Sequence, residues 1–152
     1  MMLISTRGRY ALRVLVDMAE HQTDGYMTLK EVAQRQDISV KYLEQIAAPL
    51  VQGGLLRAIR GARGGYQLCR IPEEYTVGLI LRTIEGSLSP VACVEHGETV
   101  CSRMDECVTV EVYRRINDAI DNVVDHITLR DLVELHREKQ KNREAADAAP
   151  ES

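Results

Sequence analysis

Apolar and polar residues in the first third of the chain alternate with the period of an α-helix. Between residues 9 and 20 the apolar side chains recur three or four positions apart, which predicts a helix with one buried face. Thr28 is followed three residues later by Glu31, the pattern of a capping box. A short second helix is therefore expected to begin there and to end near Gln36.

A third helix and a hairpin are predicted next. Ser39 is the expected N-cap of this helix, which should end shortly after Pro49 because proline lacks a backbone donor. Residues 55–60 and 65–69 have strand-like patterns, and the glycines between them permit a tight, basic turn. A helix followed by a basic, glycine-rich hairpin is typical of a winged helix-turn-helix, so DNA binding is the first hypothesis.

The C-terminal half shows one strong helical pattern and one long irregular segment. Residues 76–85 predict a further helix, whereas residues 87–109 have no periodicity and are expected to form a loop. From residue 112 to 127 apolar residues recur at steps of three or four, which predicts a helix of about four turns. Its apolar stripe would pack either on a second subunit or on its own domain. Thr128 should begin a short final helix, and the polar chain from residue 137 is expected to be disordered.

Charge is distributed unevenly along the 152 residues. Residues 1–70 contain ten Lys or Arg and six Asp or Glu, a net charge of +4, whereas residues 71–152 contain nine and seventeen, a net charge of −8. This asymmetry places a basic nucleic-acid face on the N-terminal half. Since the chain has six Tyr and neither Phe nor Trp, it is poorly supplied with stacking platforms for single strands, which favours duplex DNA.

Other classes of protein find little support. The chain has no apolar run long enough to span a membrane and no targeting segment, so a cytoplasmic protein without membrane contact is expected. It has no nucleophile elbow and no paired catalytic carboxylates. The glycine-rich GARGG lacks the Lys-Ser/Thr and the following helix of a phosphate-binding loop. We therefore do not expect an enzyme.

The predicted DNA contacts come from the second helix, the third helix and the hairpin turn. They are Lys30, Ser39, Val40, Lys41, Tyr42, Glu44, Gln45, Arg60 and Arg63. Glu44 can accept from cytosine N4, Gln45 can pair with adenine, and Lys41 suits phosphate. The two arginines of the turn suit the negative potential of the minor groove. For each residue alone, an ordinary solvated surface position is about as good an explanation as a DNA contact. Taken together, the residues favour DNA binding.

Three of the four cysteines, Cys93, Cys101 and Cys107, lie in the irregular segment with the spacing C-x7-C-x5-C. Thiolates favour zinc, Cu(I) or an iron-sulfur cluster, and the paired knuckles of most zinc sites are absent. Four acidic residues and one basic residue lie nearby, which should raise the thiol pKa values and disfavour a bare reactive thiolate.

Five segments resemble the Rrf2 family of bacterial winged-helix regulators, over roughly residues 3–135. They are ISTRGRYAL (4–12), ISVKYLEQI (38–46), RGARGGYQL (60–68), EGSLSPVACVE (85–95) and VVDHITLRDL (123–132). The resemblance implies a homodimeric regulator, usually a repressor, that binds two-fold symmetric operators. Within it, Glu44 and Arg60 match positions that contact bases and the minor groove.

The resemblance also implies an architecture, mainly α with a small β-wing. Residues 1–86 would form the winged helix-turn-helix domain and residues 87–110 a cysteine-bearing sensor loop. Residues 111–136 would form a long dimerisation helix and an end helix. The polar composition of residues 137–152 adds a disordered tail.

For the cysteines, the resemblance raises an iron-sulfur cluster, 2Fe–2S or 4Fe–4S, above zinc, because cluster-bearing members carry three cysteines in this loop. The fourth ligand is open, since the histidine that some members supply is Val110 here and the position used by others is Arg9. Nearby candidates are His96, Glu98, Glu106 and Glu111. The alternative is a CymR-like regulator without a cluster, controlled by a metabolic enzyme partner or a small effector of sulfur metabolism.

Overall fold

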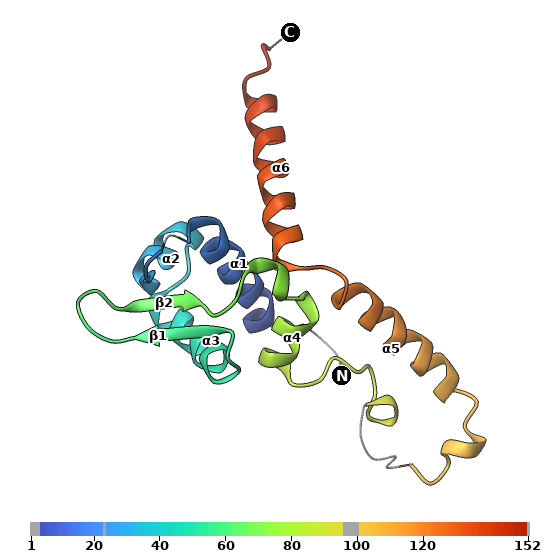
Figure 1. The fold of residues 1–152 in the computed structure, drawn as a ribbon. Coiled ribbons are helices and arrows are strands. Elements are labelled where there is room, and N and C mark those ends of the chain that lie inside the picture. Colours follow the sequence, from blue (N-terminus) through green and yellow to red (C-terminus); the bar gives the residue numbers. More distant parts are fainter. Residues whose placement is uncertain (1–3, 23, 96–100, 152) are drawn as a thin grey trace.

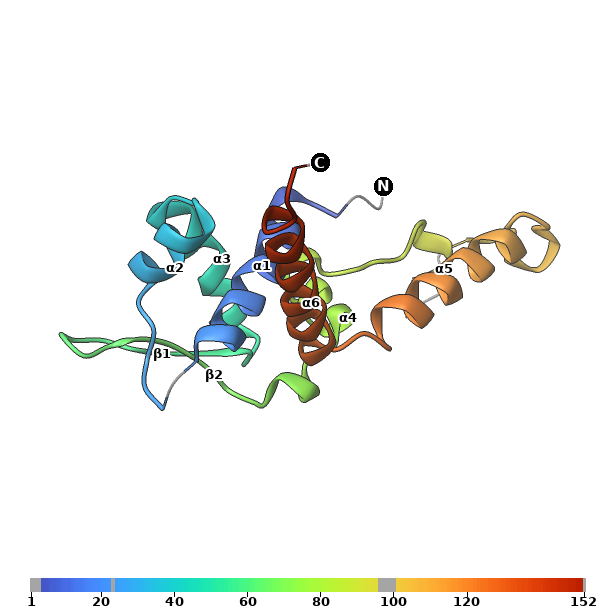
Figure 2. The same ribbon diagram turned by 90° about the horizontal axis from the view of Figure 1, so that it is seen from above.

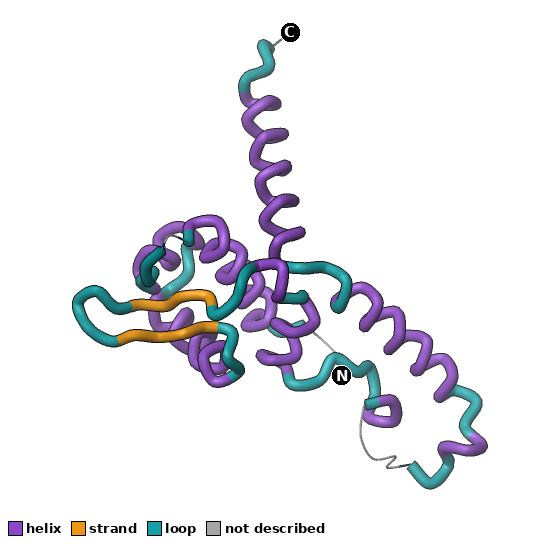
Figure 3. The backbone as a smooth tube through the Cα atoms, in the orientation of Figure 1, coloured by secondary structure: helices purple, strands orange, loops and turns teal. Residues whose placement is uncertain are grey.

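The computed structural model describes residues 4–22, 24–95 and 101–151. Helices α1 (Thr6–His21), α2 (Leu29–Gln36) and α3 (Val40–Gln52) are followed by strands β1 (Leu56–Ile59) and β2 (Gly65–Leu68) and by helix α4 (Val77–Glu85). These elements form the head of the molecule (Figure 1). In the described part of the chain, the two strands make a single antiparallel sheet that pairs Leu56 with Leu68 (Figure 3).

The second and third helices begin at the caps that the sequence predicts. The Thr28 hydroxyl accepts from the Glu31 N–H and the Glu31 carboxylate accepts from the Thr28 N–H, so the capping box is confirmed. Ser39 caps α3 by accepting from the N–H of Tyr42 at 3.2 Å. The first helix starts earlier than its apolar period indicates, because Ser5 accepts from the Gly8 N–H and adds a turn.

The core of the head lies between α1, α3, α4 and the base of the hairpin. Its largest fully buried side chains include Leu15, Leu43, Ile46, Leu50, Leu55, Tyr75 and Ile80. Pro49 sits inside α3, which continues to Gln52 as predicted. Because one face of α3 is buried in this core, its opposite face is exposed to solvent.

Two further helices extend from the head in different directions (Figures 1 and 2). They are α5 (Val110–Val124) and α6 (Leu129–Asp147). Short 3-10 turns, η1 (Pro72–Glu74), η2 (Ala92–Val94) and η3 (Met104–Glu106), lie in the connections. None of the helices in the described ranges has the length and hydropathy needed to cross a bilayer.

The corner between α5 and α6 is pinned to the head. The Val77 N–H donates to the Ile127 carbonyl at 2.9 Å, and the Leu129 N–H donates to the Tyr75 carbonyl at 2.8 Å. Arg82 of α4 also binds two carboxylates of α5, Asp121 and Asp125, each at 2.6 Å. The direction in which α5 leaves the head is therefore held by main-chain and side-chain bonds.

The expectation of a short final helix and a disordered tail from residue 137 is wrong for residues 137–147, which form the second half of α6. A capping box at Thr128 and Asp131 starts this helix. The segment is rich in Glu, Lys, Arg, Gln and Ala, which are strong helix formers. High polarity predicts disorder for this segment, but its residues also favour a helix, and residues 137–147 form one that is exposed on all sides.

Candidate nucleic-acid interface and cysteine segment

The exposed face of α3 carries most of the side chains predicted to reach DNA bases. Val40 is 40% exposed, and Lys41, Glu44 and Gln45 are exposed as well. Because the opposite face packs into the core, these side chains share one outward surface. Ser39, also exposed, is the N-cap, so its hydroxyl is occupied by the helix terminus.

Tyr42 departs from the sequence expectation of a freely exposed contact. Its ring is half-buried and meets Tyr10 of α1 edge to face, with 5.7 Å between centroids and an interplanar angle of 86°. The guanidinium of Arg13 lies over the other ring, 5.0 Å from the Tyr10 centroid. This aromatic pair fixes the first turn of α3 against α1.

The hairpin presents two exposed arginines, Arg60 and Arg63, in the turn between β1 and β2. Its underside is attached to the α1–α2 connection, where Met27 and Tyr66 exchange backbone bonds of 2.8 and 2.7 Å. Gly65 allows this approach, since its φ is +151° and a Cβ there would lie 2.5 Å from the Met27 carbonyl oxygen. The wing is thus tied to the segment that leads into α2, where Lys30 is exposed in the first turn.

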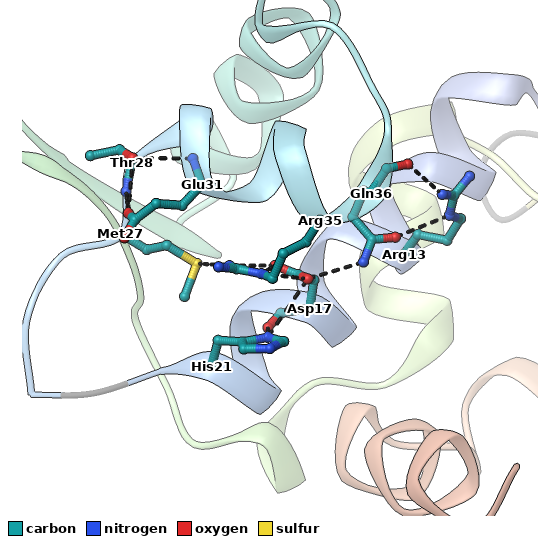
Figure 4. A network of polar contacts seen from close by, with 8 residues as sticks. All are labelled: Arg13, Asp17, His21, Met27, Thr28, Glu31, Arg35 and Gln36. Atoms are coloured by element: carbon teal, nitrogen blue, oxygen red, sulfur yellow. Dashed lines mark hydrogen bonds and ion pairs between the residues drawn. The ribbon is translucent and has the colours of Figure 1, made fainter. Parts of the chain in front are cut away.

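A buried carboxylate that sequence reasoning missed connects α1 with α2 (Figure 4). The Asp17 side chain is 1% exposed and accepts from Arg35 at 2.8 to 3.1 Å and from the Gln36 amide at 3.0 Å. Arg35 also donates to the Met27 sulfur at 3.0 Å, and Arg13 donates to the Gln36 carbonyl at 2.8 Å. The only signal in the sequence is an aspartate on the apolar face of the first predicted helix.

The cysteine segment does not form a closed site among the described residues. Cys93 and Cys101 are exposed and Cys107 is half-buried. In the ranges that the structure covers, no three His, Cys, Asp or Glu side chains lie close enough together to hold a metal ion. Soft thiolates suit an iron-sulfur cluster, but these positions do not converge on one, so the geometry does not fit a preformed centre.

Two of the four candidates for a fourth ligand lie in the described part of the chain. Glu106 and Glu111 are exposed, whereas His96 and Glu98 lie outside the described residues. The expectation that acidic neighbours raise the thiol pKa values is wrong for Cys107. Hydrogen bonds from the Thr109 hydroxyl and the Val110 N–H lower the pKa of its thiol, with Sγ and Oγ1 3.3 Å apart.

Along α5, the predicted apolar stripe is largely uncovered. Val112, Ile116 and Val123 are 54%, 43% and 59% exposed. The stripe borders an apolar groove of about 410 Å³ between α4 and α5, lined also by Ile4 and Leu88. An apolar face of this size on a helix that extends from the head is typical of a protein interface.

Comparison with known proteins identifies the family to which this fold belongs. Residues 4–135 match the model of the Rrf2 family, described as an iron-dependent transcriptional regulator. The chain belongs to the Rrf2 family. It is a transcriptional regulator of the CymR and IscR type, a DNA-binding protein and not an enzyme. The mostly helical fold with a two-stranded wing agrees with that of winged-helix relatives.

Two relatives illustrate the similarity. CymR of Bacillus subtilis is 41% identical over 131 residues, covering 86% of this chain and 89% of that protein. IscR of Aliivibrio salmonicida is 33% identical over 149 residues, covering 97% and 88%.

Solved structures give the same picture. The structure of CymR, the global cysteine regulator of B. subtilis, matches with a TM-score of 0.71 at 40% identity, covering 89% of this chain and 98% of that one. IscR of T. potens matches with a TM-score of 0.71 at 36% identity, covering 91% and 90%.

Proposed function

We propose that this Rrf2-family chain is a homodimeric repressor that reads duplex DNA with α3 and its wing. The observation that carries this proposal is the exposed polar face of α3 beside the two wing arginines, in the basic half of the sequence. A helix whose apolar face is fully packed can present its outer face to the major groove without rearrangement. Since its partner is chromosomal DNA, the protein would act in the cytoplasm.

The contacts divide into base reading and phosphate binding. Glu44 would accept from cytosine N4 and Gln45 would pair with adenine, while Lys41 would bind phosphate. Lys30, in the first turn of α2, would bind a neighbouring phosphate together with the backbone N–H groups of Ser39 and Val40 at the start of α3. Tyr42 would position the first turn of α3, since its ring packs on Tyr10.

Two copies are proposed to associate through α5. Its exposed stripe and the adjoining groove supply an apolar surface that a second α5 would cover. The heads of the two copies would then reach two half-sites, and each would add its binding energy to the other.

For sensing, we propose a 2Fe–2S or 4Fe–4S cluster held by Cys93, Cys101 and Cys107 with an undetermined fourth ligand. The three soft thiols in one segment and the IscR relatives support this proposal. The alternative is a CymR-like regulator without a cluster, which responds to a metabolic enzyme or a small sulfur-containing effector. The 41% identity to CymR and the lack of convergence among the described cysteines favour that alternative.

The DNA proposal is tested by operator binding at several salt concentrations. Arg60→Ala should weaken binding by about 1–3 kcal/mol and make the salt dependence shallower, because a minor-groove cation is lost. Arg143→Ala, on the far half of α6 where the side chain is 86% exposed, is the matched control and should bind normally. Equal binding by both variants would refute the wing assignment.

The cluster proposal is tested by anaerobic purification, followed by an absorption spectrum and by iron and sulfide assays. Visible absorption that disappears in Cys93→Ala, Cys101→Ala and Cys107→Ala, and persists in Cys69→Ala, would support the cluster. A colourless protein that binds the operator normally would support the alternative.

A further inference from the structure

Tyr75 is a fully buried tyrosine between the base of the wing and the corner where α5 meets α6. Its relative exposure is 0%, and it follows the η1 turn directly before α4. Tyr75 is not part of the DNA-reading surface. Its polar atoms nevertheless bond to the hairpin and to the α5–α6 corner, and the proposed function depends on both.

The hydroxyl of Tyr75 holds both ends of the hairpin. It donates to the Leu55 carbonyl at 2.7 Å and accepts from the N–H groups of Cys69 and Arg70 at 3.0 and 3.2 Å. Leu55 immediately precedes β1, and the other two residues immediately follow β2. A tyrosine hydroxyl has one proton and two lone pairs, so all of its capacity is used here.

The main chain of the same residue holds the corner that connects α5, the proposed dimerisation helix, to α6. The Tyr75 carbonyl accepts from the Leu129 N–H at 2.8 Å, at the start of α6. The next residues continue the attachment, since Thr76 bridges Thr128. Tyr75 therefore joins the wing to the corner between α5 and α6, through which the two heads would be connected.

We propose that Tyr75 is a positioning residue that sets the wing at a fixed angle to the dimerisation helix, and so places Arg60 correctly in both half-sites. The proposal rests on the proposed function for the wing and for the dimer. Tyr75 does not touch DNA in this account. It acts through the hairpin that its hydroxyl closes.

The wing needs such an anchor because it has little structure of its own. Each strand has four residues, and the exposed pattern of β1 leaves only Leu56 buried. A two-stranded hairpin of this size is marginally stable by itself. The hairpin base is tied to the head by the Met27–Tyr66 bridge, by the Leu55 N–H bond to the Leu50 carbonyl at 2.9 Å, and by the burial of Leu56 and Leu68 in the core. The Tyr75 hydroxyl adds three bonds at the two ends of the hairpin.

Tyr75→Phe tests this proposal because it keeps the ring and removes only the hydroxyl. Operator affinity should fall about ten-fold, within the range that losing a wing arginine spans. In an Arg60→Ala background, Tyr75→Phe should cause little further loss of operator affinity, because the Arg60 side chain that it would misplace is already absent. Tyr26→Phe, a half-buried tyrosine in the α1–α2 connection, is the matched control and should bind normally.

Limited trypsin digestion without DNA gives an independent readout. Tyr75→Phe should speed cleavage after Arg60 and Arg63 several-fold and leave cleavage after Arg137 on α6 unchanged. A substitution that only lowers overall stability would raise all three rates together and would reduce DNA affinity additively with Arg60→Ala. Either of those results overturns the proposal.

The outcomes separate this inference from the proposed function. If Arg60→Ala binds DNA normally, the wing assignment fails, and the trypsin pattern alone decides whether Tyr75 holds the wing. If Tyr75→Phe does not fold, amide hydrogen exchange on the unmodified chain decides. The Arg70 amide, which donates to the Tyr75 hydroxyl, should then exchange as slowly as the amides of α4, and exchange as fast as at the wing turn would refute the anchor.

Discussion

Removing the charge of Asp17 should weaken the attachment of α2 to α1. Its effect on the free energy of unfolding should also depend strongly on whether Arg35 is present. The carboxylate is 1% exposed and receives three bonds from Arg35 and one from Gln36, whereas the Arg35 side chain is 31% exposed. The two sides of the pair are therefore unequal. Losing the arginine leaves a buried charge, and losing the carboxylate leaves a charge that can turn toward water.

The expected magnitudes follow from this inequality. Breaking a buried pair by deleting one partner costs about 3–5 kcal/mol when the remaining charge stays buried. Arg35→Ala should therefore lower the free energy of unfolding by about 3 kcal/mol, the low end of that range, because Gln36 still donates to the carboxylate. Asp17→Asn should cost about 2 kcal/mol, the value of one or two charged hydrogen bonds. The double variant should cost less than the sum, because it buries no unpaired charge.

Urea unfolding followed by circular dichroism, at one fixed protein concentration, measures these differences. Glu134→Gln is the control, since Glu134 and its partner Arg130 are both exposed to solvent and their ion pair should contribute little to stability. If the two losses at Asp17 and Arg35 simply add to within about 0.5 kcal/mol, the two groups are not coupled and the reasoning is refuted.

Three further predictions concern the caps, the wing and the dimer face. Thr28→Ala should cost about 1 kcal/mol at neutral pH. Hydrogen bonds from the Thr28 N–H and, second, from its hydroxyl lower the pKa of Glu31 below its ordinary 4.5, so the stability that they add is present above that pH and is lost as the pH falls through the lowered value. Because alanine keeps the N–H, an acid titration of both proteins should show their difference in stability shrinking only by the share of the hydroxyl. Gly65→Ala should destabilise more than Gly54→Ala in urea unfolding, since a Cβ at Gly65 meets the Met27 carbonyl at 2.5 Å and one at Gly54 meets nothing within 4 Å. Ile116→Asp should give monomers in analytical ultracentrifugation with an unchanged circular dichroism spectrum, and persistent dimers would count against the α5 interface.

Local patterns were sufficient to predict most of the head. The caps at Thr28 and Ser39 and the apolar stripes of the first four helices depend on residues a few positions apart, and the structure confirms them. The hairpin was also predictable because its glycines and its basic turn lie together in the chain. On α3, the buried stripe alone identifies the outward residues.

Features that depend on distant contacts could not be predicted in the same way. Asp17 meets Arg35 eighteen positions later, and the Tyr75 hydroxyl bonds to Leu55 twenty positions earlier. The half-burial of Tyr42 depends on Tyr10, on another helix. The length of α6 was missed for a different reason, because an exposed helix and a disordered segment share a polar composition.

Selection of bound sequences from a random DNA duplex library tests the central claim most directly, namely that two reading heads are held at a fixed separation. The full-length protein should enrich a two-fold symmetric sequence with half-sites about one helical turn apart, and changing that spacing by half a turn should abolish tight binding. Enrichment of a single asymmetric half-site with the same affinity, or no enrichment over competitor DNA, would contradict the account.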